Sequence, residues 1–173
     1  MAKQHTPVIG KNIIESLTLG MYENPLCIYR EYIQNSADAI DKAETLCVLT
    51  PSELPAIEVQ ITENKREIVI SDNGIGISEA NAYETLTDIA ASTKEVGKDK
   101  GFRGIGRLAG LAYCEKLIFE TSYSGEAKRS VLEWDAKHLR ALIADRKKTE
   151  HAADVIKKIT SLRTEDESEG AHY

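Results

Sequence analysis

Cysteine and histidine are scarce in this chain, and neither is spaced as a metal or redox site requires. The three cysteines, Cys27, Cys47 and Cys114, form no C-x-x-C pair, and the four histidines are equally scattered. Zinc sites and redox pairs need such close spacing. The sequence therefore indicates neither kind of site, and we expect buried or unused thiols.

The chain also lacks a long apolar run. No stretch approaches the roughly 18 consecutive apolar residues of a membrane span, and the first residues, MAKQHTPVIGKN, have no apolar centre typical of a signal peptide. We therefore expect a cytoplasmic protein with no membrane partner.

An excess of positive charge is missing as well. Acidic residues number 28 and basic ones 22, which gives a formal net charge of −6. Nucleic-acid-binding surfaces are usually net basic, so nucleic acid is not indicated as a partner. One short stretch is an exception, with Lys94, Lys98, Lys100, Arg103 and Arg107 close together. It is either a solvated loop or a place where an anion is held.

With 42% hydrophobic residues, the chain can bury one core, and we expect a single domain over residues 1–173. Hydrophobic periodicity predicts helices at about 13–17, 25–44, 78–91 and 105–113. Strands are expected at about 57–61, 67–71, 116–121 and 129–134, the first two as an antiparallel hairpin. Helices on one face of a mostly antiparallel sheet give an α+β two-layer sandwich.

The helix of residues 25–44 begins with Asn24-Pro25, a pair typical of an N-cap and a first helical residue. Its apolar side, which should face a sheet, carries Tyr29, Ile33, Ala37 and Ile40.

Two further segments are set apart by composition. Residues 92–106 are rich in glycine and lysine and predict a loop or lid. Residues 136–169 are highly charged and predict a surface helical insertion, with a coil over 163–169 that leads back towards the sheet.

Three clusters of polar and glycine residues stand in a particular order. They are Glu31-x-x-x-Asn35-x-x-Asp38 on a helix, Asp72-x-Gly74-x-Gly76 after a strand, and Gly101-x-x-Gly104-x-Gly106 before a helix. Each alone is a weak signal, because helix surfaces are often polar and glycine is common in turns. The glycine clusters match neither a P-loop nor a dinucleotide-binding fingerprint. Their order and spacing in one chain are what is informative.

This order resembles the GHKL ATPases, which include gyrase B, the heat-shock chaperones, histidine kinases and MutL proteins. The resemblance covers about residues 28–121. The resemblance is strongest to the ninety-kilodalton heat-shock chaperones in the segments REYIQNSADAIDKAE, SDNGIGIS and IAASTK. The segment GFRG is closer to the corresponding motif of the MutL proteins. The resemblance implies the Bergerat-type ATP-binding fold, with ATP or ADP and Mg²⁺ as ligands.

The resemblance implies a role for each cluster. Glu31 would be the general base that positions the attacking water, and Asn35 would hold Mg²⁺. A carboxylate and an amide oxygen one helical turn apart can share such a site. Asp38 would support it through hydrogen bonds.

At the base end of the nucleotide, Asp72 would accept a hydrogen bond from the adenine amino group. Gly76, with Gly74 before it, would let the base approach the backbone. Asn73 and Ile77 either line this pocket or serve as turn and core residues.

At the phosphate end, backbone N–H groups would wrap the triphosphate, aided by the N-terminus of the following helix. The residues concerned are Gly101, Phe102, Arg103, Gly104, Ile105 and Gly106. Thr93 and Lys94 match a family position beside the lid, where lysine can reach phosphate oxygens. Arg103 and Arg107 either do likewise or are exposed to solvent.

The chain departs from the family at two points. GHKL domains usually have a late threonine that opens the last sheet strand, and this sequence ends about where that strand should begin; Thr121 lies on an earlier strand and is no safe substitute. The family also takes a phosphate-contacting lysine or arginine from a following C-terminal domain. We therefore expect nucleotide binding, with weak or absent hydrolysis in the isolated chain.

The leading hypothesis is an ATP-operated switch in which residues 92–101 close over the triphosphate, in a chaperone-like role. The resemblance also implies ATP-dependent dimerisation, which is common in the family. One alternative is a nucleotide-binding sensor without turnover. Others are the ATPase domain of a DNA repair, topoisomerase or defence protein, and a purely structural role for all three clusters.

Overall fold

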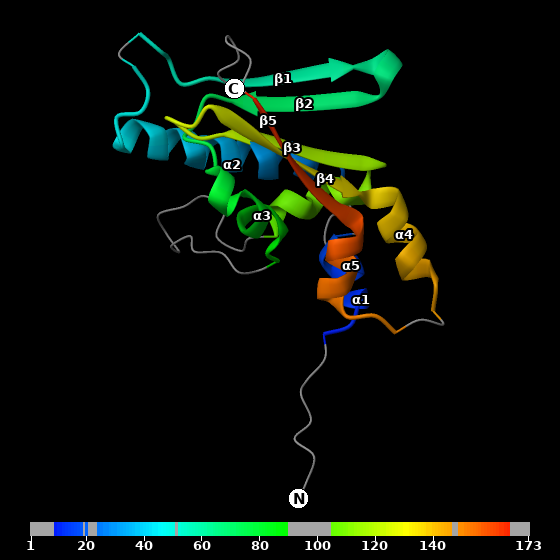
Figure 1. Ribbon diagram of the computed structural model, residues 1–173. Coiled ribbons are helices and arrows are strands. Elements are labelled where there is room, and N and C mark those ends of the chain that lie inside the picture. Colours follow the sequence, from blue (N-terminus) through cyan, green and yellow to red (C-terminus); the bar gives the residue numbers. More distant parts are fainter. Residues whose placement is uncertain are drawn as a thin grey trace, which may run out of the picture.

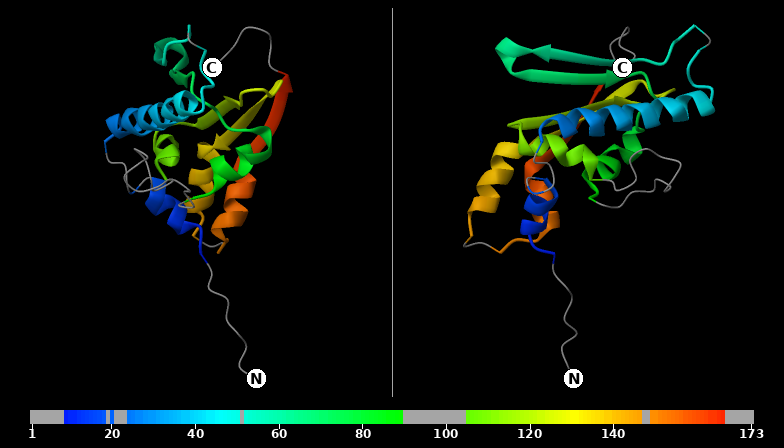
Figure 2. Two further views of the ribbon diagram at one scale, coloured as in Figure 1. Left: turned by 90° about the vertical axis from the view of Figure 1, so that its left-hand side faces the viewer. Right: turned by 180° about the vertical axis from the view of Figure 1, so that it is seen from behind.

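A computed structural model of the chain describes residues 9–18, 20, 24–50, 52–89, 105–146 and 149–166, and it contains two antiparallel sheets. β1 (Ile57–Thr62) pairs with β2 (Glu67–Asp72). β3 (Lys116–Ser122), β4 (Lys128–Asp135) and β5 (Thr160–Asp166) form the second sheet in that order. Both views in Figure 2 place the β1–β2 hairpin at one end of the molecule and helices α1, α4 and α5 at the other. The predicted α+β class is confirmed (Figure 1).

The predicted hairpin is confirmed, and its register runs from Ile57 opposite Asp72 to Thr62 opposite Glu67. A short 3₁₀ turn, Glu63–Lys65, joins the strands, and Arg66 follows it in the left-handed region with φ 53°. β-branched residues favour the extended conformation in both strands: they alternate with polar residues in β1 and are consecutive at 68–70 in β2. Asp72 is the last residue of β2 and so lies at the end of the hairpin.

Helix α2 (Leu26–Thr45) is the long predicted helix. The amide of Leu26 donates to Oδ1 of Asn24 at 3.0 Å, so Asn24 caps the first turn as predicted. The predicted apolar side is wrong at Ile33, which is 38% exposed. The ring of Tyr32 instead packs edge-on against Phe119 of β3, and since successive helical residues are turned by roughly 100°, this turns Ile33 outward.

Helix α3 (Glu79–Thr87) begins where the sequence predicted and ends sooner, because Asp88 is already extended, with ψ 123°. The predicted helix at 105–113 is present as the 3₁₀ helix η2 (Gly106–Ala112), which is anchored in the core by Leu108 and Leu111. Most of the predicted lid, residues 92–104 of 92–106, lies outside the described residues.

The prediction of helices within 136–169 is confirmed, but the prediction that they form a surface insertion is wrong. Helices α4 (Ala136–Ala144) and α5 (Ala152–Ile159) bury Leu139, Val155 and Ile159 in the same core as Trp134. Val155 and Ile159 stand four residues apart and share one face of α5, while the charged residues face outward. The high charge of the segment therefore concealed an amphipathic helix.

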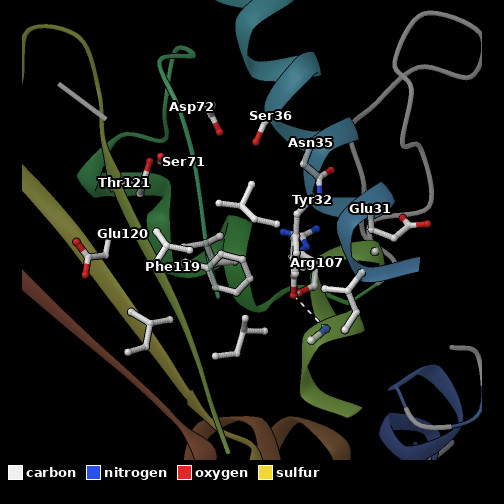
Figure 3. Close-up of a pocket in the computed structure, with 18 of the residues that line it drawn as sticks. Glu31, Tyr32, Asn35, Ser36, Ser71, Asp72, Arg107, Phe119, Glu120 and Thr121 are labelled. Carbon is white, nitrogen blue, oxygen red and sulfur yellow. Dashed lines mark hydrogen bonds between the residues drawn. The ribbon is translucent and has the colours of Figure 1, made fainter. Parts of the chain in front are cut away.

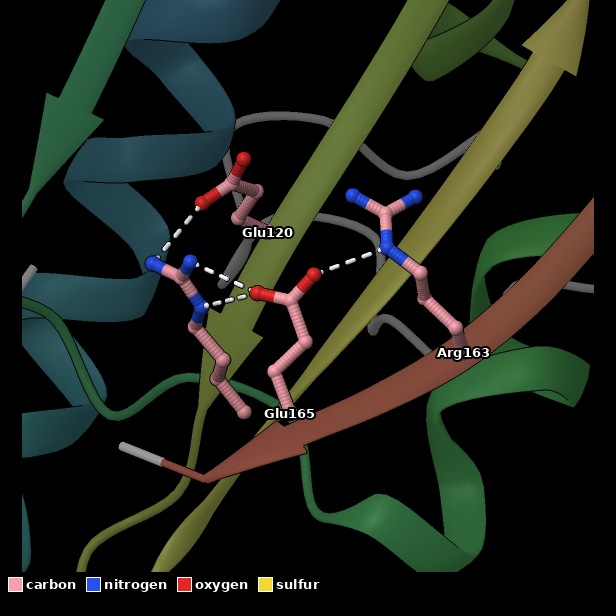
Figure 4. A network of polar contacts seen from close by, with 4 residues as sticks. Glu120, Arg163 and Glu165 are labelled. Carbon is pink, nitrogen blue, oxygen red and sulfur yellow. Dashed lines mark hydrogen bonds and ion pairs between the residues drawn. The ribbon is translucent and has the colours of Figure 1, made fainter. Parts of the chain in front are cut away.

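The predicted coil at 163–169 is also wrong over its described part, because β5 continues to Asp166 and pairs with β4, with Leu162 opposite Leu132. Its alternate charged side chains point to one face, where Arg129 binds Oε2 of Glu165 at 2.7 Å and Oε2 of Glu120 at 3.2 Å (Figure 4). Arg163 binds the other oxygen of Glu165 at 2.8 Å. Arg163 and Arg129 together lower the pKa of the Glu165 carboxyl.

The segment that precedes helix α1 (Asn12–Thr18) is fastened to the loop between α4 and α5. Gly10 bridges His151, and the buried ammonium of Lys11 donates to the carbonyl of Asp145 at 2.6 Å. Over the described ranges, no helix is long and apolar enough to cross a membrane.

Candidate functional site

One large cavity lies between α2, α3, η2 and the edges of β2 and β3, and it brings the described parts of the three sequence clusters together (Figure 3). Its volume is about 2190 Å³. β2 and β3 belong to separate sheets, so their facing edges are not joined by a ladder and both line the cavity. Of the predicted site residues, the lining includes Glu31, Asn35, Asp38, Asp72, Gly74, Gly76, Ile77, Ile105 and Gly106.

Helix α2 supplies the first cluster. Figure 3 shows Glu31 and Asn35 one helical turn apart on the same helix. The Glu31 side chain is 18% exposed, and its Oε1 accepts from the Arg30 guanidinium at 2.9 Å. Gly106 lies directly against this carboxylate, and a Cβ there would overlap Oε2 of Glu31. Asp38 is buried further along the helix, at 4% exposed.

The chain leaving β2 supplies the second cluster. Oδ1 of Asp72 accepts the Gly74 amide at 3.0 Å, a turn in which the side chain bonds to the backbone two residues on. Gly74 passes close to α2, since a Cβ there would lie 2.6 Å from the Cβ of Ala39, and the Ile75 amide donates to the Ala39 carbonyl at 3.1 Å. The Asp72 carboxylate is thereby fixed at the cavity wall.

Gly76 and Ile77 join this turn to the end of β3. Gly76 has φ +70° and lies against the Ser122 carbonyl, while the Ile77 amide donates to Oγ1 of Thr121 at 2.9 Å. Ile77 also packs against the main core, so it both lines the cavity and belongs to the hydrophobic interior. Thr121 and Ser71, both labelled in Figure 3, line this cavity as well.

Asn73 lies outside the cavity lining. Its Oδ1 accepts the Ala56 amide at 2.9 Å and its Nδ2 donates to the Leu54 carbonyl at 2.9 Å. Both bonds hold the segment that leads into β1. Of the two roles open to Asn73 in the sequence, the turn role is the one the geometry supports.

The start of η2 supplies the described end of the third cluster. Ile105 is buried and Gly106 faces Glu31, as described above. Arg107 follows at the cavity wall, where burial lowers the pKa of its guanidinium and nearby Asp88 raises it. The other predicted phosphate-site residues lie outside the described part of the chain, namely Thr93, Lys94, Gly101, Phe102, Arg103 and Gly104.

Two residues of the cavity wall, Tyr32 and Thr121, were not assigned from the sequence. Each makes its bonds to a residue more than 40 positions away, the Tyr32 hydroxyl to the η2 backbone and the Thr121 hydroxyl to Ile77. No local pattern signals such contacts. Only the folded structure shows that the chain leaving β2 contacts the end of β3.

The cavity wall carries an oxygen donor of the kind that a magnesium ion bound together with a nucleotide would use. In the described ranges, no group of three or more histidine, cysteine, aspartate or glutamate side chains could hold a metal ion. Mg²⁺ with nucleotides commonly takes one or two protein oxygens, the rest coming from phosphates and water. The Asn35 amide oxygen, on the cavity wall, is a donor of this kind.

Comparison with known proteins gives one family. A family model described as histidine kinase-, DNA gyrase B-, and HSP90-like ATPase matches residues 27–167. The chain is also 30% identical over 144 residues to the chaperone protein HtpG of Legionella pneumophila (strain Lens) and 28% identical over 144 residues to that of Wolinella succinogenes. Each alignment covers 73% of this chain and 23% of the relative, so the chain spans under a quarter of the length of these proteins.

The family model covers α2 from Cys27, the hairpin, α3, η2 and the three-stranded sheet, and it includes every residue that lines the cavity except Pro25. The resemblance seen in the sequence is therefore confirmed, and the chain belongs to the histidine kinase-, DNA gyrase B- and HSP90-like ATPase family.

Proposed function

We propose that this chain binds ATP in the cavity between α2, β2 and η2 and, within a longer polypeptide, hydrolyses it slowly to ADP and phosphate. The observation that supports this most directly is that Glu31 and Asn35 of α2 line the same cavity as Asp72 at the end of β2. Membership of an ATPase family supports the same proposal.

The adenine would lie beside Asp72 and Gly76. Oδ1 of Asp72 already accepts the Gly74 amide, and the second carboxylate oxygen would accept the exocyclic amine of adenine. Guanine presents a carbonyl at that position, which would leave two acceptors facing each other in a buried place. The pocket would therefore select adenine over guanine.

The triphosphate would run from this end towards η2. Backbone N–H groups of residues 101–106 would hold it, with Lys94, Arg103 and Arg107 as cationic side chains nearby and Thr93 beside them. Asn35 would hold the accompanying Mg²⁺, which would neutralise part of the phosphate charge. Gly106 at the cavity wall leaves backbone, rather than a side chain, next to Glu31.

Hydrolysis would use Glu31 as the general base. Its carboxylate would take a proton from a water molecule whose oxygen bonds to the γ-phosphorus, while the bond from that phosphorus to the β–γ bridging oxygen breaks and ADP leaves. The buried Asp38 would support the arrangement through hydrogen bonds. A lysine or arginine from a C-terminal domain would add the cationic contact to the terminal phosphate.

The biological role we propose is a conformational switch of the HtpG kind in the cytoplasm, with closure of residues 92–101 over the triphosphate and ATP-dependent dimerisation. The similarity to chaperone proteins supports it. ATP would shift the equilibrium between an open and a closed conformation by binding the closed conformation more tightly.

Isothermal titration of ADP and of a non-hydrolysable ATP analogue, with magnesium, tests the binding proposal. Asparagine at position 72 has a single side-chain oxygen, so Asp72→Asn can keep the Gly74 bond or the base bond but not both. We expect the wild type to bind both ligands and Asp72→Asn to bind at least tenfold more weakly. Asp166→Asn, the same change at the exposed end of β5, should bind like the wild type. A wild type that binds neither ligand would refute the proposal.

A further inference from the structure

The hydroxyl group of Tyr32 joins α2 to η2. It donates to the carbonyl of Arg107 at 2.9 Å and accepts the amide of Gly110 at 3.0 Å. A tyrosine hydroxyl can donate one hydrogen bond and can also accept one, and the Tyr32 hydroxyl does both here. One side chain of α2 thus holds two backbone groups of η2 that lie three residues apart.

The position of this hydroxyl is fixed from two sides. The Tyr32 ring packs edge-on against Phe119 of β3, with centroids 6.3 Å apart and planes at 73°. At the other end, Gly110 leaves the space that the hydroxyl occupies, since a Cβ there would lie 2.6 Å from the Tyr32 oxygen. Ring, hydroxyl and glycine therefore fit as one unit.

Tyr32 and Gly110 join α2 to η2, the two elements that would surround the triphosphate in the proposed function. Tyr32 directly follows Glu31 on α2 and is three residues before Asn35, while Arg107 and Gly110 lie on the same 3₁₀ helix as Gly106. Gly106 in turn lies against Glu31. The spacing between α2 and the start of η2 at this point therefore depends on the Tyr32 bonds.

We propose that Tyr32 is a positioning residue: its hydroxyl sets the start of η2 at the correct distance from Glu31 and Asn35, and so favours the triphosphate without contributing to adenine recognition. This inference rests on the proposed function. Packing against Phe119 alone would be satisfied by phenylalanine. The two hydrogen bonds to η2 are what phenylalanine would lose.

The contrast between ligands tests this role. Tyr32→Phe should bind adenosine as tightly as the wild type does, because the Asp72 end of the cavity is untouched. It should bind a non-hydrolysable ATP analogue with magnesium about tenfold more weakly, the loss typical of hydrogen bonds removed at a half-buried place. Tyr83→Phe is the matched control, since it removes a hydroxyl from an exposed tyrosine of α3.

A second pair of variants tests the fit itself. Gly110→Ala should also weaken analogue binding, because its methyl group would collide with the Tyr32 hydroxyl. Combining it with Tyr32→Phe removes the colliding oxygen, so the double variant should lose less than the two single losses combined. The melting temperature of each variant, followed through the fluorescence of Trp134, shows that it is folded at the temperature of the titration.

The outcomes separate the two proposals. If the wild type binds adenosine and the analogue but Tyr32→Phe weakens both equally, or neither, the positioning role is refuted and the proposed function stands. Additive losses in the double variant would refute the role as well. If the wild type binds no adenine ligand, the proposed function fails, and the role of Tyr32 fails with it.

Discussion

Gly76 and Ser122 lie so close together that a Cβ on the glycine would overlap the serine carbonyl oxygen. The contact joins the chain that leaves β2 to the end of β3, although these strands belong to separate sheets. The neighbouring bond from the Ile77 amide to Oγ1 of Thr121 fastens the same two segments. The Asp72 end of the cavity is therefore held by its own contacts rather than by a continuous sheet.

Gly76→Ala should destabilise the fold by about 3 kcal/mol, because it combines a left-handed backbone at φ +70° with a collision against β3. Gly125→Ala is the control: its φ is +88°, but nothing lies within 4 Å of the added Cβ, so only the backbone strain of about 1 kcal/mol should appear. Urea denaturation followed by the fluorescence of Trp134, the single tryptophan, measures both. Equal losses in the two variants would contradict the close approach.

Thr121→Val should cost about 1–2 kcal/mol of stability, because it leaves the half-buried Ile77 amide without its hydroxyl acceptor while keeping a β-branched side chain in the strand. Thr121→Ser retains the hydroxyl and should recover most of the loss. Thr164→Val removes a more exposed hydroxyl, 3.3 Å from Oε1 of Glu79, and should change stability by no more than about 0.5 kcal/mol. The same urea titration gives all three values, and a Ser variant as unstable as the Val variant would argue against the hydrogen bond.

The elements that the sequence predicted well are those with local signals. The cap at Asn24 marks the start of α2, and alternation with a polar turn marks the β1–β2 hairpin. The order of the three clusters also pointed to one nucleotide site, and the residues of these clusters that the structure describes do line one cavity, apart from Asn73.

The errors arose where tertiary packing outweighs composition. α5 lies in a highly charged segment and carries three charged residues among its eight, yet its Val155 and Ile159 are almost completely buried. β5 alternates between leucine or threonine and charged residues over 162–165. Its Glu165 pairs with Arg129 of β4 and with Arg163 of its own strand, so these charges are not solvated alone. Tyr32 and Thr121 became site residues through partners distant in sequence, which a single sequence does not reveal.

Val155→Ala tests whether α5 belongs to the core. The side chain is 0% exposed and packs in the cluster around Trp134, so truncation should cost about 2 kcal/mol through lost contacts and a residual cavity. Lys157→Ala, on the exposed face of the same helix, should stay within about 0.5 kcal/mol of the wild type. If the two variants were equally stable, the segment would be the surface insertion that its composition suggested.

Glu31→Gln separates nucleotide binding from hydrolysis. Glutamine keeps the size of the side chain but does not take up the proton of the attacking water, so in the longer polypeptide proposed above kcat should fall by roughly 10²–10⁴-fold. The affinity for ADP should change by less than about threefold, because Glu31 lies against Gly106 at the phosphate end and away from Asp72. Glu44→Gln, an exposed glutamate on the same helix, should leave both quantities unchanged. Phosphate release measured under saturating ATP decides the matter: turnover retained in Glu31→Gln would remove Glu31 as the base and leave a nucleotide-binding module, whereas loss of turnover with binding intact would place the proton transfer at this carboxylate.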